Sequence, residues 1–219
     1  MKQIARSISR ELPGKASLKH LKYLLFLPAG YKEKETEKSW PLILFLHGSG
    51  ERGSDLELVK RNGIAKIVEE LADFPFITIS PQCPEDSRWT EQAEIVMLLL
   101  EEIEEKYNVN PQKVYLTGLS MGGYGTWLLA AQHPEKFAAI APICGGGDPQ
   151  WAPRLKDMPI WAFHGAQDDI VPLEKSQIMV RAVKEQGGNV CFTIYPEAGH
   201  DSWVKAYDDP ELCQWFLAN

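Results

Sequence analysis

The segment of residues 114–124, VYLTGLSMGGY, constrains the fold of this chain more than any other. A run of β-branched and aromatic residues ends in GLSMG, and a helix-like stretch over residues 124–133 follows at once. This order predicts a strand, a sharp turn and a helix, with Ser120 at the apex of the turn. A serine hydroxyl is a weak nucleophile that needs a base and nearby backbone N–H donors. Ser120 is therefore a candidate catalytic nucleophile.

The G-x-S-x-G pattern is weak evidence when it stands alone. The alternative is a glycine-rich helix start that packs under a sheet, with no chemical role for Ser120. Three further segments of the chain favour the catalytic interpretation, because each lies where a serine hydrolase needs its remaining groups.

Residues 42–50, LILFLHGSG, are the first of these segments. A continuous apolar run predicts a strand buried on both faces, and the glycines after it let backbone N–H groups face a cavity. An oxyanion hole needs two such donors aimed at one point. We expect them to be the N–H of Met121, at the start of the helix after the turn, and the N–H of Ser49. A tight strand–loop connection is the alternative.

Residues 160–172, IWAFHGAQDDIVP, are the second segment. A buried strand is followed by a loop with two adjacent carboxylates, and Pro172 is expected to open the next helix. A carboxylate is needed to hold the catalytic base in the correct tautomer. Asp168 or Asp169 can supply it, while the other is solvated or caps the following helix.

The third segment is the last predicted strand, residues 190–195, followed by PEAGHD. His200 lies in the loop after this strand, where the general base is expected. Ser120, the acid and His200 then follow in the chain order of α/β-hydrolases. The other four histidines have positions that need no catalytic role. His20 lies in the polar leader, and His133 lies at a helix end. His47 and His164 each precede a glycine in a strand-end loop.

These motifs together resemble the phospholipase/carboxylesterase branch of the α/β-hydrolases. FLHGSGERG, SPQCPEDSRW, VYLTGLSMGGYGTW, FHGAQDDIVP and YPEAGHDSW carry the likeness, which runs from about Leu42 to the C-terminus. More narrowly, the chain is similar to small bacterial serine esterases labelled predicted peptidases or feruloyl-esterase-like proteins. The resemblance implies that Asp168, the fourth residue after His164, is the acid of the triad. It also implies a Ser49/Met121 oxyanion pair.

Strand-like and helix-like stretches alternate along the chain. Expected strands cover residues 21–27, 42–46, 76–80 and 137–143, and expected helices cover residues 56–71, 91–107 and 172–186, besides the segments above. Residues 32–38 are interpreted as a solvated hairpin turn. This alternation predicts an α/β-hydrolase fold with a mostly parallel central sheet and helices on both faces, in one domain over residues 1–219.

The net charge of −7 argues against nucleic acid or an anionic membrane as a partner, and mildly against highly anionic substrates. No stretch is apolar enough to span a membrane and no apolar signal core precedes residue 15, so we expect a cytoplasmic protein. The cysteines lack metal-site spacing, so neither a metal nor another cofactor is expected. Cys144 and Cys191 lie in strand-like runs and are expected to be small buried residues.

Only residues 144–157 separate two of the predicted strands, which is too short for a helical lid. We therefore expect an open, shallow site suited to small soluble esters. Trp89, in a loop at the carboxyl edge of the sheet, and Trp151, in this short crossover, are tentative substrate-binding residues, with core packing as the alternative for each. Glu51 and Arg52 are expected to form an ion pair that holds the oxyanion loop.

The expected activity is hydrolysis of small, short-chain carboxylic esters through an acyl-enzyme. A peptidase or amidase of the same fold is the second hypothesis, because the same triad cleaves amides. Dienelactone-hydrolase-like chemistry would normally place a cysteine at the position of Ser120. A non-catalytic binding protein is the third hypothesis, and such proteins usually lose a member of the triad.

Overall fold

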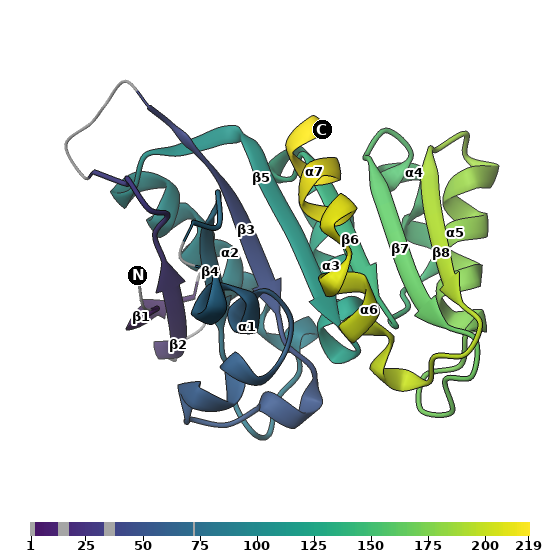
Figure 1. Ribbon diagram of the computed structural model, residues 1–219, viewed down its shortest axis with the longest axis horizontal. Coiled ribbons are helices and arrows are strands. Elements are labelled where there is room, and N and C mark those ends of the chain that lie inside the picture. Colours follow the sequence, from purple (N-terminus) through teal and green to yellow (C-terminus); the bar gives the residue numbers. More distant parts are fainter. Residues whose placement is uncertain (1–2, 13–17, 33–37, 72) are drawn as a thin grey trace.

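A single mixed sheet of eight strands forms the centre of the molecule (Figure 1). The computed structural model describes residues 3–12, 18–32, 38–71 and 73–219. The strand order is β1-β2-β4-β3-β5-β6-β7-β8. The strands are β1 (Ile4–Glu11), β2 (Leu18–Phe26), β3 (Trp40–Leu46), β4 (Ile77–Pro81), β5 (Val109–Leu119), β6 (Ala139–Ile143), β7 (Ile160–Gly165) and β8 (Val190–Tyr195).

Six neighbouring strands, from β4 to β8 in the sheet order, run parallel to one another. β2 pairs antiparallel with both β1 and β4. Parallel strands need crossover connections, and most of those in this chain contain helices. The carboxyl ends of β3, β5, β7 and β8 therefore meet at one edge of the sheet, which is where ligands bind in open α/β sheets.

Helices cover both faces of the sheet, and each face has its own core. The longer helices are α1 (Gly63–Glu70), α2 (Trp89–Lys106), α3 (Met121–Gln132), α5 (Glu174–Glu185), α6 (Trp203–Asp208) and α7 (Pro210–Ala218), with the short α4 (Ala152–Leu155) and the 3-10 helices η1 (Ser49–Glu51), η2 (Leu56–Arg61), η3 (Pro134–Lys136), η4 (Pro149–Trp151) and η5 (His200–Ser202). α1, α6 and α7 pack on one face, and α2 to α5 pack on the other (Figure 1).

The central strands are apolar on both sides because both of their faces are covered. Leu42 and Leu44 of β3 belong to one core, whereas Ile43 and Phe45 belong to the other, and all four are fully buried. This alternation follows from the two-residue period of a strand. It explains why the sequence of β3 is a continuous apolar run rather than an alternating one.

The mostly parallel central sheet with helices on both faces, expected from the sequence, is confirmed. Three details differ. The first is the N-terminal strand β1, which was not expected. The second is the expected helix over residues 56–71, which is divided into η2 and α1 at Asn62 and Gly63. Gly63 has a φ of +61°. Residues 33–37 of the expected hairpin turn lie outside the described residues, but β2 and β3 do not pair, because β4 lies between them.

The cysteine predictions are half right. Cys144 is buried, as expected, but Cys191 is exposed. The prediction for Cys191 is wrong because β8 is the last strand of the sheet, so its side chains are less covered than those of the central strands.

Candidate active site

Ser120 lies at the sharp turn between β5 and α3. Its backbone has φ 53° and ψ −115°, a conformation that a residue with a side chain rarely adopts. Two glycines let the turn close. A Cβ atom at Gly118 would lie 2.5 Å from the carbonyl oxygen of Gly122, and a Cβ atom at Gly122 would lie 2.6 Å from the carbonyl carbon of Leu46. The sequence GLSMG therefore folds as the strained turn that the pattern predicts.

The structure brings the three expected triad residues into one hydrogen-bonded chain. The Ser120 hydroxyl lies 2.9 Å from Nε2 of His200, and Nδ1 of His200 lies 2.8 Å from Oδ2 of Asp168. Ser120 follows β5, Asp168 follows β7 and His200 follows β8. With Nδ1–H donating to the carboxylate, Nε2 is free to accept the serine proton. This arrangement can generate a serine nucleophile.

Asp168 is the carboxylate that reaches His200, while Asp169 is exposed. The second oxygen of Asp168 accepts the backbone N–H groups of Ile170, at 3.0 Å, and Val171, at 2.8 Å. Burial alone would raise the pKa of Asp168, but the hydrogen bond from His200 and these two N–H groups outweigh it, so the pKa is below its ordinary value. The carboxylate is therefore fixed in orientation and ionised.

His164 is a neighbour of the triad whose contact with Asp168 sequence reasoning missed. Its ring is fully buried, with Nδ1 2.7 Å from the hydroxyl of Ser176 and Nε2 2.9 Å from the carbonyl oxygen of Val171. Nε2 also lies 3.3 Å from Oδ2 of Asp168. Burial holds the pKa of His164 below its ordinary value. The H-G-x-x-D spacing that singled out Asp168 was the signal for this contact.

The two expected oxyanion donors lie beside Ser120. Ser49 is the first residue of η1, after β3, and Met121 is the first residue of α3. N–H groups in the first turn of a helix have no acceptor within the helix. Both residues line the same cavity as Ser120. Their backbone N–H groups are thus available to a negatively charged oxygen there, and their role stays a prediction.

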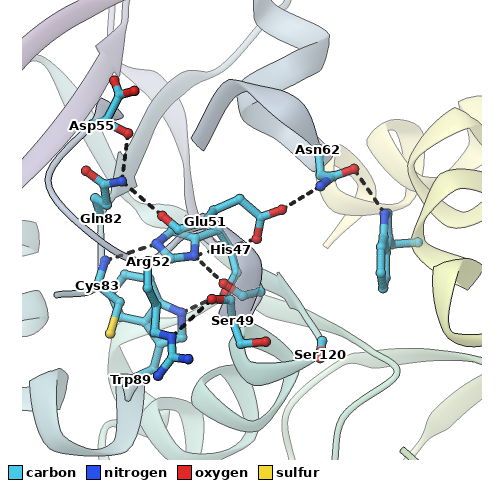
Figure 2. Close-up of polar contacts among 12 residues, drawn as sticks. His47, Ser49, Glu51, Arg52, Asp55, Asn62, Gln82, Cys83, Trp89 and Ser120 are labelled. Atoms are coloured by element: carbon cyan, nitrogen blue, oxygen red, sulfur yellow. Dashed lines mark hydrogen bonds and ion pairs between the residues drawn. The ribbon is translucent and has the colours of Figure 1, made fainter. Parts of the chain in front are cut away.

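His47 holds the loop that carries Ser49. The ring is fully buried; Nδ1–H donates to the carbonyl oxygen of Gly48 at 2.6 Å, and Nε2 accepts the N–H of Cys83 at 3.0 Å (Figure 2). The indole N–H of Trp89 donates to the carbonyl oxygen of His47 at 2.8 Å. Burial lowers the pKa of His47 to about 4. His47 is therefore neutral near neutral pH, as these bonds require.

Glu51 and Arg52 hold the loop separately, and the expected ion pair between them is wrong. In Figure 2 the two side chains leave the loop in different directions. Glu51 is buried and accepts a hydrogen bond from Asn62. Arg52 donates to the carbonyl oxygens of Ser49 and Ser87. The physical reason is that consecutive residues of a tight turn cannot both point to the same side.

A cavity of about 300 Å³ opens beside the nucleophile. Trp89 contributes to it, but the residue is only 1% exposed and belongs to the first turn of α2 rather than to a loop. Trp151 packs near Gly147 and does not line this cavity. Substrate binding by either tryptophan stays a prediction. The cavity is lined by Ser49, Arg52, Arg88, Trp89, Thr90, Ser120, Met121 and Tyr124.

The described residues include one group whose ligand atoms lie close enough to hold a metal ion. Cys144, Asp168 and His200 place one such atom each within 4.8 Å of one another. Burial raises the pKa of the Cys144 thiol to about 12, so the thiol stays protonated. A protonated thiol is a poor metal ligand, and Asp168 and His200 are already bonded to each other. This chemistry fits a proton-transfer chain better than a metal centre.

Sequence comparison connects this site to known proteins. The model of the dienelactone hydrolase family matches residues 84–209, which is more than half of the chain and includes Ser120, Asp168 and His200. A bifunctional acetylxylan esterase/xylanase of Neocallimastix patriciarum is 29% identical over 152 residues, or 67% of this chain and 22% of that protein. A poly(3-hydroxyoctanoate) depolymerase of Pseudomonas fluorescens is 27% identical over 213 residues, or 82% of this chain and 74% of that protein.

A solved structure is similar over nearly the whole chain. The crystal structure of a thermostable esterase superposes with a TM-score of 0.81 at 33% identity, covering 98% of this chain and 62% of the esterase. This chain therefore spans less than two thirds of that esterase and less than a quarter of the acetylxylan esterase/xylanase. In the part of the chain that the structure describes, no helix is long and apolar enough to cross a membrane.

Proposed function

This chain belongs to the dienelactone hydrolase family of the α/β-hydrolases, and we propose that it is a serine hydrolase of carboxylic esters. The observation that carries the proposal is the hydrogen-bonded chain from Ser120 through His200 to Asp168, which ends in an open cavity. The esterase function named for two of its relatives is consistent with it. The residue at the turn is Ser120 and not the cysteine associated with dienelactone chemistry. The proposed nucleophile is therefore a serine hydroxyl, which forms an ester acyl-enzyme, rather than a cysteine thiolate.

The proposed reaction has two halves. Ser120 Oγ attacks the ester carbonyl while Nε2 of His200 takes the hydroxyl proton, and Asp168 stabilises the imidazolium. The N–H groups of Ser49 and Met121 hold the oxyanion of the tetrahedral intermediate. His200 then gives its proton to the leaving alcohol, so an acyl-enzyme remains. Water repeats the sequence, which releases the carboxylic acid and returns the proton to Ser120.

The substrates we propose are small esters with short acyl groups. The crossover between β6 and β7 contains only η4 and α4, which leaves little chain to cover a long acyl group. The cavity also holds positive charge, because Arg52 and the exposed Arg88 line it although the whole chain carries −7. An ester with a negatively charged group is therefore worth testing beside neutral ones.

Peptide or amide hydrolysis is the second candidate, because the same chain of groups acts on amides. The cavity of about 300 Å³ is small for an extended peptide, which favours esters. A binding protein without catalysis is the remaining alternative, and the complete Ser–His–Asp arrangement argues against it.

The test compares the parent protein with Ser120→Ala on a panel of p-nitrophenyl esters. The panel contains acetate, butyrate, decanoate and a hemisuccinate, with a p-nitroanilide for the amide reaction. We expect ester turnover by the parent, higher kcat/KM for butyrate than for decanoate, and loss of turnover in Ser120→Ala with an unchanged circular dichroism spectrum. Labelling of the parent by a fluorophosphonate at Ser120 is the second readout. Turnover of Ser120→Ala within tenfold of the parent, or no labelling of the parent, would contradict the proposal.

A further inference from the structure

A buried carboxylate lies next to the oxyanion loop without being needed for the proposed reaction. Glu51, two residues after Ser49, is only 6% exposed. One of its oxygens accepts a hydrogen bond from Nδ2 of Asn62 at 2.6 Å, and the other lies 3.9 Å from Nδ1 of the neutral His47. Burying a carboxylate is costly unless hydrogen bonds compensate. A buried carboxylate this close to the oxyanion loop therefore suggests a structural or functional role for Glu51.

Asn62 connects Glu51 to Trp203, which lies in a different part of the chain. It lies between η2 and α1, and both ends of its side-chain amide are engaged. Nδ2 donates to Glu51, while Oδ1 accepts the indole N–H of Trp203 at 3.2 Å. A carboxylate can only accept and an indole N–H can only donate, so the orientation of the amide is determined. Figure 2 shows Asn62 between Glu51 and this second bond.

Trp203 completes the connection to the general base. It is the first residue of α6, directly after the η5 turn that carries His200. The rings of Trp203 and His200 lie with their centroids 5.2 Å apart and their planes at 88°, an edge-to-face contact. Such contacts restrict the tilt of both rings. The bond from the indole to Asn62 in turn restrains Trp203.

We propose that Glu51, Asn62 and Trp203 form a positioning relay that places the oxyanion loop and the His200 ring relative to each other. The inference rests on the proposed function, because it assigns a task to residues beside that site. The relay joins the oxyanion loop to the His200 ring through the side chains of these three residues. It acts through Ser49 and His200 and does not itself contact the reacting atoms.

The physical reason for such a relay is the precision that the reaction needs. Ser49 lies after β3, near the middle of the sheet order, and His200 lies after β8 at its edge, with three strands between them. Catalytic groups must be held within about 0.5 Å of productive geometry by bonded neighbours. A bond to a charged group contributes roughly twice as much as a neutral one, so a buried carboxylate suits this purpose.

Asn62→Asp is the first test. It places a carboxylate against that of Glu51, so the two repel when both are ionised and share a proton at lower pH. We expect kcat on p-nitrophenyl butyrate to fall about tenfold or more at pH 8 with KM nearly unchanged, because the lost positioning matters in the transition state. The ratio of variant to parent kcat should rise as the pH is lowered to 6. A purely structural role would not give this pH dependence.

The double variant Glu51→Gln with Asn62→Asp is the matched rescue. It exchanges the amide and the carboxylate, so position 51 now donates, position 62 accepts, and the indole N–H still has an acceptor. The total charge equals that of the parent. We expect most of the kcat lost in Asn62→Asp to return and the pH dependence to match the parent. Glu57→Gln, on the exposed side of η2, is the control for the loop and should leave kcat unchanged.

Trp203→Phe tests the relay from its other end and without a charge change. It removes the indole N–H and keeps an aromatic ring near His200. We expect kcat to fall about fivefold and hydrogen exchange of residues 48–52 to speed up, although the substitution is in α6. The exchange measurement does not depend on ester hydrolysis. An inactive parent would overturn the proposed function alone, whereas unchanged exchange in Trp203→Phe, an Asn62→Asp kcat within twofold of the parent, or no rescue in the double variant would overturn the relay.

Discussion

At the residue scale, two neighbouring acids with similar surroundings in the sequence have different surroundings in the structure. Asp168 is bonded to His200 and to two backbone N–H groups, whereas Asp169 is exposed. We expect Asp168→Asn to lower kcat by on the order of 10⁴, because an amide favours the wrong tautomer of the histidine. Asp169→Asn should change kcat little. Both variants are purified and assayed on p-nitrophenyl butyrate near neutral pH.

The comparison between the two variants decides the assignment. The two side chains leave consecutive residues in different directions, so Asp169→Asn carries the same change of charge without touching His200. A large loss in Asp169→Asn with a small one in Asp168→Asn would mean that the acid is misassigned by one residue. Equal losses would point to an effect of charge rather than of the bond to His200.

The same scale shows what a residue pattern can and cannot predict. Ser120, Asp168 and His200 each follow a predicted strand, so the order of elements was enough to predict that they meet. The direction of Glu51 could not be predicted in this way, since its partner Asn62 belongs to another loop. The contact of His164 with Asp168, by contrast, has a local signal in the H-G-x-x-D spacing.

At the element scale, the turn between β5 and α3 depends on the absence of two side chains. A Cβ atom at Gly122 would lie 2.6 Å from the carbonyl carbon of Leu46 and 2.8 Å from the carbonyl oxygen of His47, which are both backbone atoms. Because backbone cannot move aside as a flexible side chain can, we expect Gly122→Ala to lower the free energy of unfolding by about 3 kcal/mol or more. Urea denaturation measures the change.

Gly50→Ala is the control for this prediction. Gly50 also belongs to a loop at the active site, but a Cβ atom there would meet nothing within 4 Å. Its free energy of unfolding should stay within about 0.5 kcal/mol of the parent. If Gly122→Ala is as stable as Gly50→Ala, the turn is not as tightly packed against β3 as the structure has it.

The elements that the sequence did not predict are those with weak periodicity. In β1 only one of eight residues is buried, so no apolar pattern distinguishes it from a polar leader. The break between η2 and α1 requires the positive φ of Gly63, whose Cβ would collide with Phe45 of β3. That collision is a tertiary contact and has no local signal. β3 was predicted because the length of its apolar run is itself a signal, and the second half of β5 because its β-branched and aromatic residues lead into the G-x-S-x-G turn.

At the scale of the whole molecule, the pairing of the strands in space explains why distant segments form one site. The order β4-β3-β5-β6-β7-β8 brings the ends of β3, β5, β7 and β8 to a single edge. Alternating strands and helices predicted a parallel sheet, and a parallel sheet alone implies such an edge. The cavity and its arginines could not be predicted, since they depend on how α2 and the loops pack above that edge.

Stability of the whole molecule should depend on pH through His47. Its pKa is lowered to about 4 in the folded protein from 6.5, first of all by burial. Below about pH 6.5 the His47 ring takes up a proton in the unfolded chain but stays neutral in the folded protein. The free energy of unfolding therefore falls as the pH drops from 6.5 to 4. The shift corresponds to a loss of about 3 kcal/mol over this range. Asp168, whose pKa is also lowered, adds its loss only near and below pH 4.

The measurement is the free energy of unfolding from urea titrations between pH 7 and pH 4.5, for the parent and for His47→Gln. The variant should be less stable than the parent at pH 7, because it loses the buried ring and its hydrogen bonds. Because a glutamine does not titrate, the variant should lose clearly less stability than the parent as the pH falls. His164, which is also buried with a lowered pKa, accounts for part of the slope that remains. His20→Gln, at an exposed position of β2, is the control for removing a histidine outside the core. Parallel curves for the parent and His47→Gln would show that His47 accepts a proton in the folded protein, and that the oxyanion loop tolerates the charge.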